Sequence, residues 1–177
     1  MKRYILTGAP GAGKTVLLRA LEHAGHAVVE EAATDVIALA QAQDVAEPWT
    51  NPGFIDAIVT LQKQREARAV GDLVFFDRSP VCALALARFL DHPVSGLLNA
   101  ELARIAAEGV YQRRVFLLRG LGFITPTAAR RIGLEEALAF EAVHEATYRK
   151  LGFELISVEP GSVAERVKAV LARITEA

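Results

Sequence analysis

Residues 4–18, YILTGAPGAGKTVLL, constrain the fold more strongly than any other stretch of the chain. Within it, Gly8, Gly13, Lys14 and Thr15 satisfy the pattern G-x-x-x-x-G-K-[ST] of a phosphate-binding loop. The four residues before the loop are apolar and β-prone, which predicts a buried parallel strand. Apolar residues recur at helical spacing after the loop, so a helix is expected to begin there. The order of strand, glycine-rich turn and helix predicts an α/β fold with a phosphate site at the turn.

The physical basis of this pattern is the charge of a nucleoside triphosphate. Backbone N–H groups in a tight turn, backed by a helix N-terminus, can replace the water that the phosphates lose. Glycines permit the dihedral angles and the close approach that the turn requires. Lys14 is expected to reach the outer phosphates, and the Thr15 hydroxyl to bind Mg²⁺. We therefore predict that ATP and Mg²⁺ are held by the loop and the first helical turn, formed by Gly8, Ala9, Pro10, Gly11, Ala12, Gly13, Lys14, Thr15 and Val16.

Length and composition favour a single domain over residues 1–177, because 177 residues with 52% hydrophobic content suit one well-packed core. The formal net charge is −1, with 20 basic against 21 acidic residues, so no nucleic acid or anionic membrane partner is expected. Cys82 is the only cysteine, which excludes a disulfide framework and favours a buried, inert thiol. With no signal peptide or membrane span expected, we predict a cytoplasmic monomer or small homo-oligomer.

Short apolar runs alternate with helical patterns along the rest of the chain. Strands are expected at residues 4–7, 26–29, 73–76, 115–118 and 153–158. Helices are expected from the loop to about residue 25 and at residues 34–43, 54–70, 80–90, 97–108, 134–151 and 163–175. Thr34 or Asp35 is the predicted N-cap of the second helix, and Ser79 that of the helix beginning at Pro80. This alternation predicts a parallel sheet covered by helices on both faces.

Four polar clusters follow the predicted strands. They are the phosphate-binding loop, the pair Glu30–Glu31, the pair Asp77–Arg78, and a predicted lid over residues 119–133 that contains Arg119, Arg130 and Arg131. Ligands of such sheets gather at the carboxyl ends of the strands. The four clusters are therefore expected to converge on one active site.

Asp77 and Arg78 end an apolar strand, where an acidic residue commonly binds Mg²⁺. We expect Asp77 to hold the metal opposite Thr15, the alternative being an Asp that caps the next helix. Arg78 is interpreted as a clamp on phosphate or substrate, because a planar guanidinium suits phosphate oxygens. The alternative is an ion-pair partner of Asp77.

Glu30 and Glu31 are adjacent at a strand end, so the pleat directs them to opposite sides and only one can face the site. A carboxylate near the transferred phosphate can accept a proton from an acceptor hydroxyl. Two solvated glutamates at a helix start remain the alternative. In the lid, Arg130 or Arg131 would neutralise charge on the transferred phosphoryl group, unless both are solvated.

Other polar and aromatic residues leave their interpretation open. Gln62 and Arg65 share one face of a helix and either contact a substrate or form a polar helix end. Trp49, in a loop with two prolines, either stacks on a substrate ring or fills the core. The histidines show no metal-ligand spacing and are interpreted as surface or packing residues, namely His23, His26, His92 and His144.

The whole chain resembles the P-loop kinase-like predicted ATPases of bacteria, an AAA-labelled family, and is similar to the kinase domain of NadR-type ribosylnicotinamide kinases. The matching stretches are YILTGAPGAGKT, VVEEAA, FFDRSP, RVFLL and LGFELISVEPGSVAERV. VVEEAA and FFDRS also resemble deoxynucleoside kinase segments. This local resemblance implies Glu31 as the base, Asp77 for Mg²⁺ and Arg78 as the clamp on the acceptor. The resemblance also implies the strand order 2-3-1-4-5.

The lid differs from the pattern of that family, which is roughly D-x-E-R. Here the stretch is Ala128-Ala129-Arg130-Arg131, so Arg131 alone matches and is the predicted catalytic arginine. The leading hypothesis is ATP- and Mg²⁺-dependent phosphoryl transfer to a small, nucleoside-like molecule. The altered lid motivates an alternative, a nucleotide-dependent switch or slow ATPase with a protein partner. An AAA+ motor is disfavoured by chain length, and the lack of an N/T-K-x-D guanine signature favours ATP over GTP.

Overall fold

The computed structural model describes residues 1–120 and 133–175, in which five strands form one sheet. The strands are β1 (Lys2–Thr7), β2 (Ala27–Val29), β3 (Leu73–Asp77), β4 (Arg114–Leu118) and β5 (Glu154–Val158). Their order is β2-β3-β1-β4-β5 and every neighbouring pair is parallel. The predicted parallel α/β sheet and its strand order are therefore confirmed.

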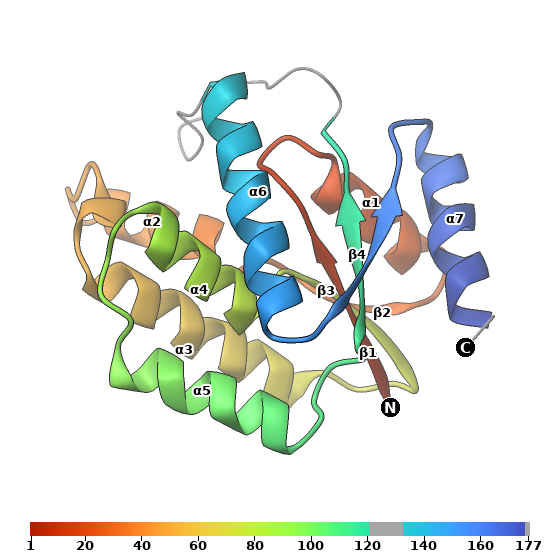
Figure 1. Cartoon of the computed structure of the whole chain (residues 1–177), viewed down its shortest axis with the longest axis horizontal. Coiled ribbons are helices and arrows are strands. Elements are labelled where there is room, and N and C mark those ends of the chain that lie inside the picture. Colours follow the sequence, from red (N-terminus) through yellow and green to blue (C-terminus); the bar gives the residue numbers. More distant parts are fainter. Residues whose placement is uncertain (121–132, 176–177) are drawn as a thin grey trace.

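Helices cover both faces of the sheet (Figure 1). They are α1 (Lys14–His23), α2 (Ala33–Gln41), the 3₁₀ helix η1 (Pro48–Thr50), α3 (Gly53–Arg68), α4 (Pro80–Phe89), α5 (Gly96–Ala107), α6 (Leu134–Lys150) and α7 (Val163–Thr175). Figure 1 shows α1 and α7 on one side and α3 to α6 on the other. In this view β1, β4 and β5 run upward, and the turns that follow these three strands lie at the top.

The alternation of side chains along β1 builds two cores. Tyr4 and Leu6 face the layer of α1 and α7, where they pack with Leu17, Leu18 and Val170. Ile5 faces the opposite layer, in a cluster with residues of α4, α5 and α6. When both faces of a strand are buried, the side chains on both faces must be apolar. This explains why β1 and β3 are nearly continuous apolar runs.

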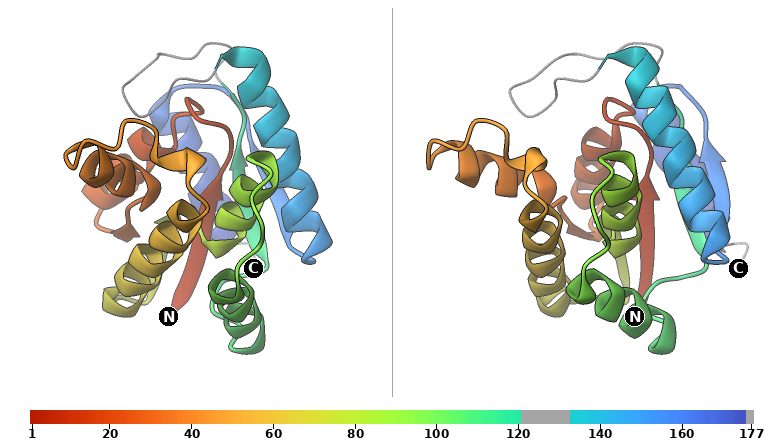
Figure 2. Two further views of the ribbon diagram at one scale, coloured as in Figure 1. Left: turned by 90° about the vertical axis from the view of Figure 1, so that its left-hand side faces the viewer. Right: turned by 60° about the vertical axis from the view of Figure 1, so that its left-hand side comes forward.

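A third apolar cluster joins α2, α3, α4 and α5 beside the sheet. Phe54 and Ile58 of α3 pack there against Leu84 of α4, with Trp49 half-buried at its margin. Figure 2 shows α2 above α3, toward the end of the sheet where the strands finish. The structure therefore supports the packing interpretation of Trp49, and these helices build a wall next to the strand ends.

The two predicted helix caps have different outcomes. Ser79 is the N-cap of α4, where its hydroxyl accepts a hydrogen bond from the Val81 amide at 3.2 Å and Pro80 is the first helical residue. The prediction for α2 is wrong, because the helix begins at Ala33 without a side-chain cap. Thr34 and Asp35 lie within the first turn, where their side chains bind other partners.

The described residues contain no helix that is long and apolar enough to cross a membrane. The sulfur of Cys82 is buried in the α4 layer, 3.4 Å from the Thr7 hydroxyl and 3.1 Å from the Tyr148 hydroxyl. The expectation of a buried thiol is therefore confirmed.

Substituting Gly8 tests how tightly the first turn is packed against the sheet. A Cβ at this position would lie 2.4 Å from the backbone oxygen of Leu118, and the φ angle of +133° also disfavours an L-residue. We expect Gly8→Ala to lower the free energy of unfolding by at least about 3 kcal/mol, measured by urea denaturation. The control is Gly96→Ala, because a Cβ at Gly96 meets nothing within 4 Å. That variant should stay within about 0.5 kcal/mol of the parent protein, and equal losses in both variants would contradict the packing argument.

Candidate functional site

The turn between β1 and α1 forms a loop of backbone amides at the carboxyl end of the sheet. Gly8, Gly11 and Gly13 all have positive φ angles, of 133°, 86° and 83°, which L-residues rarely adopt. Gly13 is the N-cap of α1. The amides of Gly13, Lys14 and Thr15 have no acceptor within the described residues, as expected for the first turn of a helix. This geometry suits an anion.

The Lys14 side chain folds back over this loop. Its ammonium group donates to the backbone oxygens of Gly8 and Ala9 at 3.0 and 2.8 Å, and the residue is only 6% exposed. Burial and the nearby Arg78 guanidinium lower the pKa of Lys14 to about 8, although Asp77 and Glu31 oppose the shift. Among the described residues, Lys14 is thus a buried cation with no carboxylate partner at hydrogen-bond distance, and a bound polyphosphate would supply the missing negative charge.

The lowered pKa of Lys14 predicts a pH dependence of nucleotide binding. Bound phosphate favours the protonated amine, whereas the free protein loses this proton above about pH 8. Binding above that pH must therefore take up a proton, and the affinity should fall by nearly tenfold per pH unit. The measurement is calorimetric titration with AMP-PNP at about pH 7, 8, 9 and 10. Lys14→Met should give a flat profile over the same range, and an equal slope in both proteins would contradict this assignment.

Thr15, in the first turn of α1, lies beside Asp77, the last residue of β3. The Thr15 hydroxyl donates to Asp77 Oδ2 at 3.3 Å. The other oxygen, Oδ1, is buried and has no hydrogen-bond partner among the described residues. Burial is the main cause that raises the pKa of Asp77, with Lys14 opposing it. An orphaned carboxylate oxygen beside a hydroxyl fits a divalent cation, since Mg²⁺ carried by a nucleotide needs only one or two protein ligands.

Glu31 and Arg78 form an ion pair where β2 and β3 end. Arg78 Nε donates to Glu31 Oε1 at 2.5 Å, and both side chains are largely buried. Burial opposes the charge of Glu31, but Arg78 and then Lys14 outweigh it and hold the pKa of this carboxyl below its ordinary value. At Arg78 burial acts to lower the pKa, but the surrounding negative groups, Glu31 foremost and also Asp77, together with the hydrogen bond to Glu31, outweigh burial and raise the pKa. The backbone of Arg78 has a φ angle of +73°, an arrangement that costs about 1–3 kcal/mol and is common at functional sites.

His144 of α6 completes this group, and sequence reasoning missed it. Its Nδ1 lies 2.9 Å from the Phe140 backbone oxygen, so Nδ1 carries the proton and Nε2 accepts a hydrogen bond from Arg78 Nη1 at 3.1 Å. Burial and the Arg78 charge lower the pKa of His144 to about 3, which keeps the ring neutral. No motif pointed to His144, because only the packing of α6 against α4 brings it to Arg78.

The adjacent acid, Glu30, lies on the other side of the strand. It is paired with Arg19 on the surface, whereas Glu31 faces the loop residues. Arg65 of α3 donates to the backbone oxygens of both glutamates and pairs with Asp35. Arg65 therefore fixes the end of β2 and, through it, the direction of the Glu31 side chain.

Two further residues from the sequence analysis have distinct outcomes. Gln62 lies one helical turn before Arg65, is 3% exposed, and its Nε2 has no partner in the described part of the chain. The polar helix end expected there is thus buried. Arg131, the predicted lid arginine, lies outside the described residues, as does Arg130.

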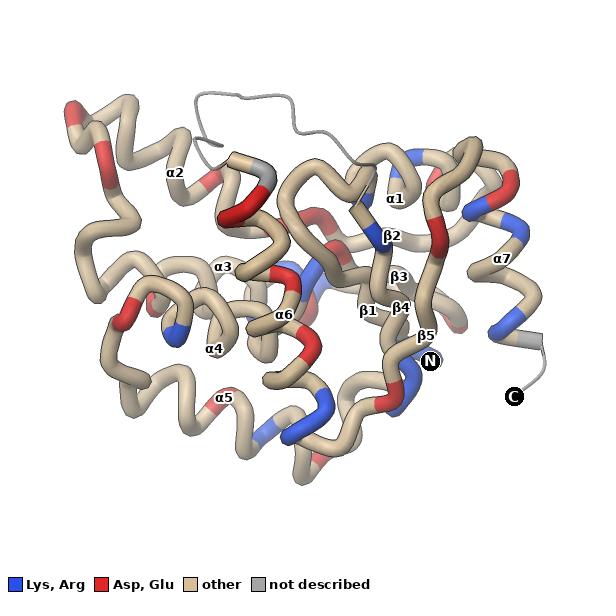
Figure 3. The backbone as a smooth tube through the Cα atoms, turned by 45° about the horizontal axis from the view of Figure 1, so that its top comes forward, with Lys and Arg blue, Asp and Glu red and all other residues tan. Residues whose placement is uncertain are grey.

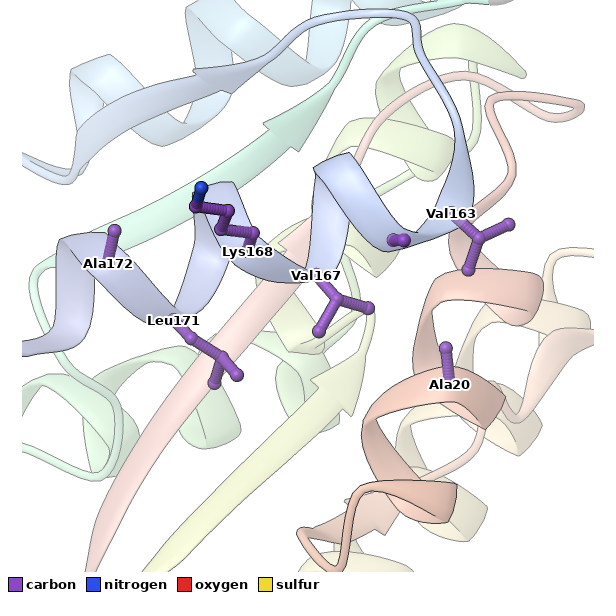
Figure 4. Close-up of a pocket in the computed structure, with 7 residues that line it drawn as sticks. Ala20, Val163, Val167, Lys168, Leu171 and Ala172 are labelled. Carbon is purple, nitrogen blue, oxygen red and sulfur yellow. The ribbon is translucent and has the colours of Figure 1, made fainter.

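The charge distribution and the surface groove outside this site do not indicate a second nucleotide site among the described residues. Figure 3 shows acidic and basic residues interspersed over the elements around the strand ends. Within the described residues, no group of three or more His, Cys, Asp or Glu side chains could by itself hold a metal. A groove between α1 and α7 is lined by mostly apolar residues (Figure 4), namely Ala20, Val163, Val167, Lys168, Leu171 and Ala172. None of its lining residues belongs to the loop, Glu31, Asp77 or Arg78, so it is separate from the candidate site.

Solved structures with a similar fold include a NadR protein and two small-molecule kinases. A NadR protein in complex with NAD and AMP-PNP has a TM-score of 0.68 at 17% identity, covering 97% of this chain and 49% of that one. The chain thus spans about half the length of NadR. Deoxyadenosine kinase from M. mycoides with bound dCTP has a TM-score of 0.62 at 15% identity, with both chains covered fully at 100%. Shikimate kinase from Acinetobacter baumannii with shikimate has a TM-score of 0.59 at 15% identity, covering 99% and 94% of the two chains.

These structural similarities show the shared fold and nothing more, since all of them are below 25% sequence identity. Among curated proteins, no sequence matches the chain. A family model described as AAA domain matches residues 3–166, which include the loop, both strand-end pairs and His144. The chain therefore belongs to this AAA domain family, as a P-loop kinase-like protein.

Proposed function

We propose that the protein is an ATP- and Mg²⁺-dependent phosphotransferase that acts on a small, nucleoside-like molecule carrying a hydroxyl or phosphate acceptor. The observation that carries the proposal is the meeting of Lys14, Asp77, Glu31 and Arg78 at the ends of three adjacent strands. A nucleotide site alone needs Lys14, Thr15 and Asp77. The additional buried pair of Glu31 and Arg78 supports a second substrate.

Each residue has a role in the proposed reaction. The loop amides and Lys14 bind the β- and γ-phosphates of ATP, and Thr15 and Asp77 hold the Mg²⁺ that neutralises their charge. Glu31 accepts the proton of the acceptor hydroxyl, while Arg78 orients the acceptor. Arg131 is the proposed source of further positive charge on the transferring group.

The acceptor would lie between α3 and the end of β2. Gln62 supports this placement, because its buried amide Nε2 has no acceptor among residues 1–120 and 133–175 and a bound substrate could accept its hydrogen bond. NadR, deoxyadenosine kinase and shikimate kinase, each solved with a small molecule, support the general class of substrate. We further propose that the protein acts in the cytoplasm, where ATP and Mg²⁺ are supplied.

The test measures which product carries the label from γ-labelled ATP when nucleosides, ribosylnicotinamide or shikimate are present. Label in a small-molecule product is the expected result, with Lys14→Met as the background. Label only in free phosphate would instead favour the slow ATPase or switch that the altered lid, Ala128 to Arg131, suggests. If the protein binds AMP-PNP but forms neither a labelled small molecule nor labelled free phosphate, both activities are excluded.

A further inference from the structure

Arg166, in the first turns of α7, connects three loops at the carboxyl end of the sheet. Its Nη1 donates to the Ala12 backbone oxygen at 2.6 Å, its Nη2 to the Arg119 oxygen at 2.8 Å, and its Nε to the Glu159 oxygen at 3.0 Å. These carbonyls follow β1, β4 and β5 respectively. One guanidinium thus joins the phosphate-binding loop to two turns more than a hundred residues away.

Within the described residues, this arginine is a buried cation whose hydrogen bonds all go to neutral backbone oxygens. The residue is 5% exposed, and no ion pair joins it to a carboxylate in the part of the chain that the structure describes. Burial lowers the pKa of Arg166, with only the charge of Glu159 opposing the shift. Buried charges are usually paired, because the desolvation of an isolated cation is unfavourable. A bound polyanion at the neighbouring loop would offset this charge.

The contact with Ala12 determines how the next amide points. In a trans peptide the carbonyl and the following N–H are antiparallel. Because Arg166 holds the Ala12 oxygen toward α7, the Gly13 amide points away from α7. That amide has no acceptor among the described residues. Without Arg166, the Ala12–Gly13 peptide could rotate, since Gly13 tolerates both signs of φ.

We propose that Arg166 is a positioning residue of the nucleotide site, which fixes the Ala12–Gly13 peptide so that the Gly13 amide faces the phosphates. Its buried charge adds positive potential behind the loop. The inference rests on the proposed function only in requiring that a polyphosphate occupies the loop, and it is independent of the acceptor. It also makes α7 part of the phosphate site, although α7 contributes no residue to the sequence motif.

The experiment compares Arg166→Met, Arg166→Lys and the control Arg114→Met. Arg114 is a matched control, because its Nη1 also donates to a carbonyl of α7, that of Arg173 at 3.3 Å, but from the opposite end of β4. Affinities for AMP-PNP with Mg²⁺ and for inorganic tripolyphosphate are measured by calorimetry. We expect Arg166→Met to bind both probes about 10- to 100-fold more weakly, as for loss of a charge-assisted hydrogen bond.

Arg166→Lys keeps the charge but cannot bind three carbonyls at once, so an intermediate loss is expected. Arg114→Met should bind both probes as the parent does. A merely structural role predicts a lower melting temperature with unchanged affinity in the folded protein, and that result would overturn the proposal. If the parent itself binds neither probe, the proposed function fails instead.

A measurement on the parent protein keeps the inference testable if Arg166→Met does not fold. Hydrogen exchange with and without AMP-PNP should show slower exchange in the first turns of α7, because loop and helix are joined through Arg166. Protection confined to the loop and α1 would contradict this coupling.

Discussion

Replacing Lys14 with methionine is expected to lower kcat/KM for ATP-dependent turnover on the order of 10³-fold. The amine donates to the loop carbonyls of Gly8 and Ala9, and phosphoryl transfer depends on stabilising charge rather than on covalent chemistry. Methionine has a similar length and no charge, so the loop should keep its shape. The measurement is steady-state turnover, together with the affinity for AMP-PNP.

The same variant should not be less stable than the parent. Burial disfavours the charged form of Lys14 in the free protein, and methionine removes this unfavourable term. A melting temperature that is equal or higher, combined with lost activity, distinguishes a functional lysine from a structural one. The control is Lys150→Met, an exposed position at the end of α6 that should keep full activity. Full turnover in Lys14→Met would exclude the proposed mechanism.

Replacing Glu31 with glutamine should lower kcat for transfer to the acceptor by about 10²- to 10⁴-fold, the range for loss of a general base. Glutamine keeps an oxygen that can accept from Arg78 Nε, so the geometry of the pair is largely retained. Because the loop is unchanged, the affinity for AMP-PNP should stay within about threefold of the parent. The measurement is single-turnover transfer from γ-labelled ATP.

Glu30→Gln is the matched control, because Glu30 is the adjacent residue and pairs with Arg19 on the surface. It should change neither transfer nor stability by more than about 0.5 kcal/mol. Glu31→Gln is expected to lose about 1–3 kcal/mol of stability, since the Arg78 charge keeps only a neutral partner in a partly buried site. Equal activities of the two variants would show that Glu31 is not the base.

Local sequence patterns were sufficient to predict features whose interacting groups lie within a few residues of one another. The loop from Gly8 to Thr15 is recognisable because phosphate binding requires consecutive glycines and backbone amides before a helix. Ser79 and Pro80 identified a helix start for the same reason, as all the interacting groups lie within three residues. The cap of α2 was predicted wrongly, because Thr34 binds Glu31 and Asp35 binds Arg65, from another helix.

For the candidate site, the sequence predicted where the residues lie but not all of their side-chain partners. Alternation of strands and helices was enough to bring the loop, Glu31 and Asp77 to one end of a sheet, as parallel topology requires. For Arg78 the sequence favoured a clamp on phosphate or substrate, with an ion pair to Asp77 as the alternative. The structure pairs it with Glu31 and with His144, whose 66-residue separation from Arg78 gives no local signal.

The sequence by itself determined that this chain is a parallel α/β protein with a phosphate-binding loop, because strand, turn and helix propensities act over a few residues. Tertiary structure alone decided which distant groups support that loop. Arg166 reaches Ala12 across 154 residues, and His144 reaches Arg78 only after α6 packs beside α4. The physical reason is that buried polar groups take their partners from whatever the packed layers bring within hydrogen-bond distance, and no spacing in the sequence encodes that distance.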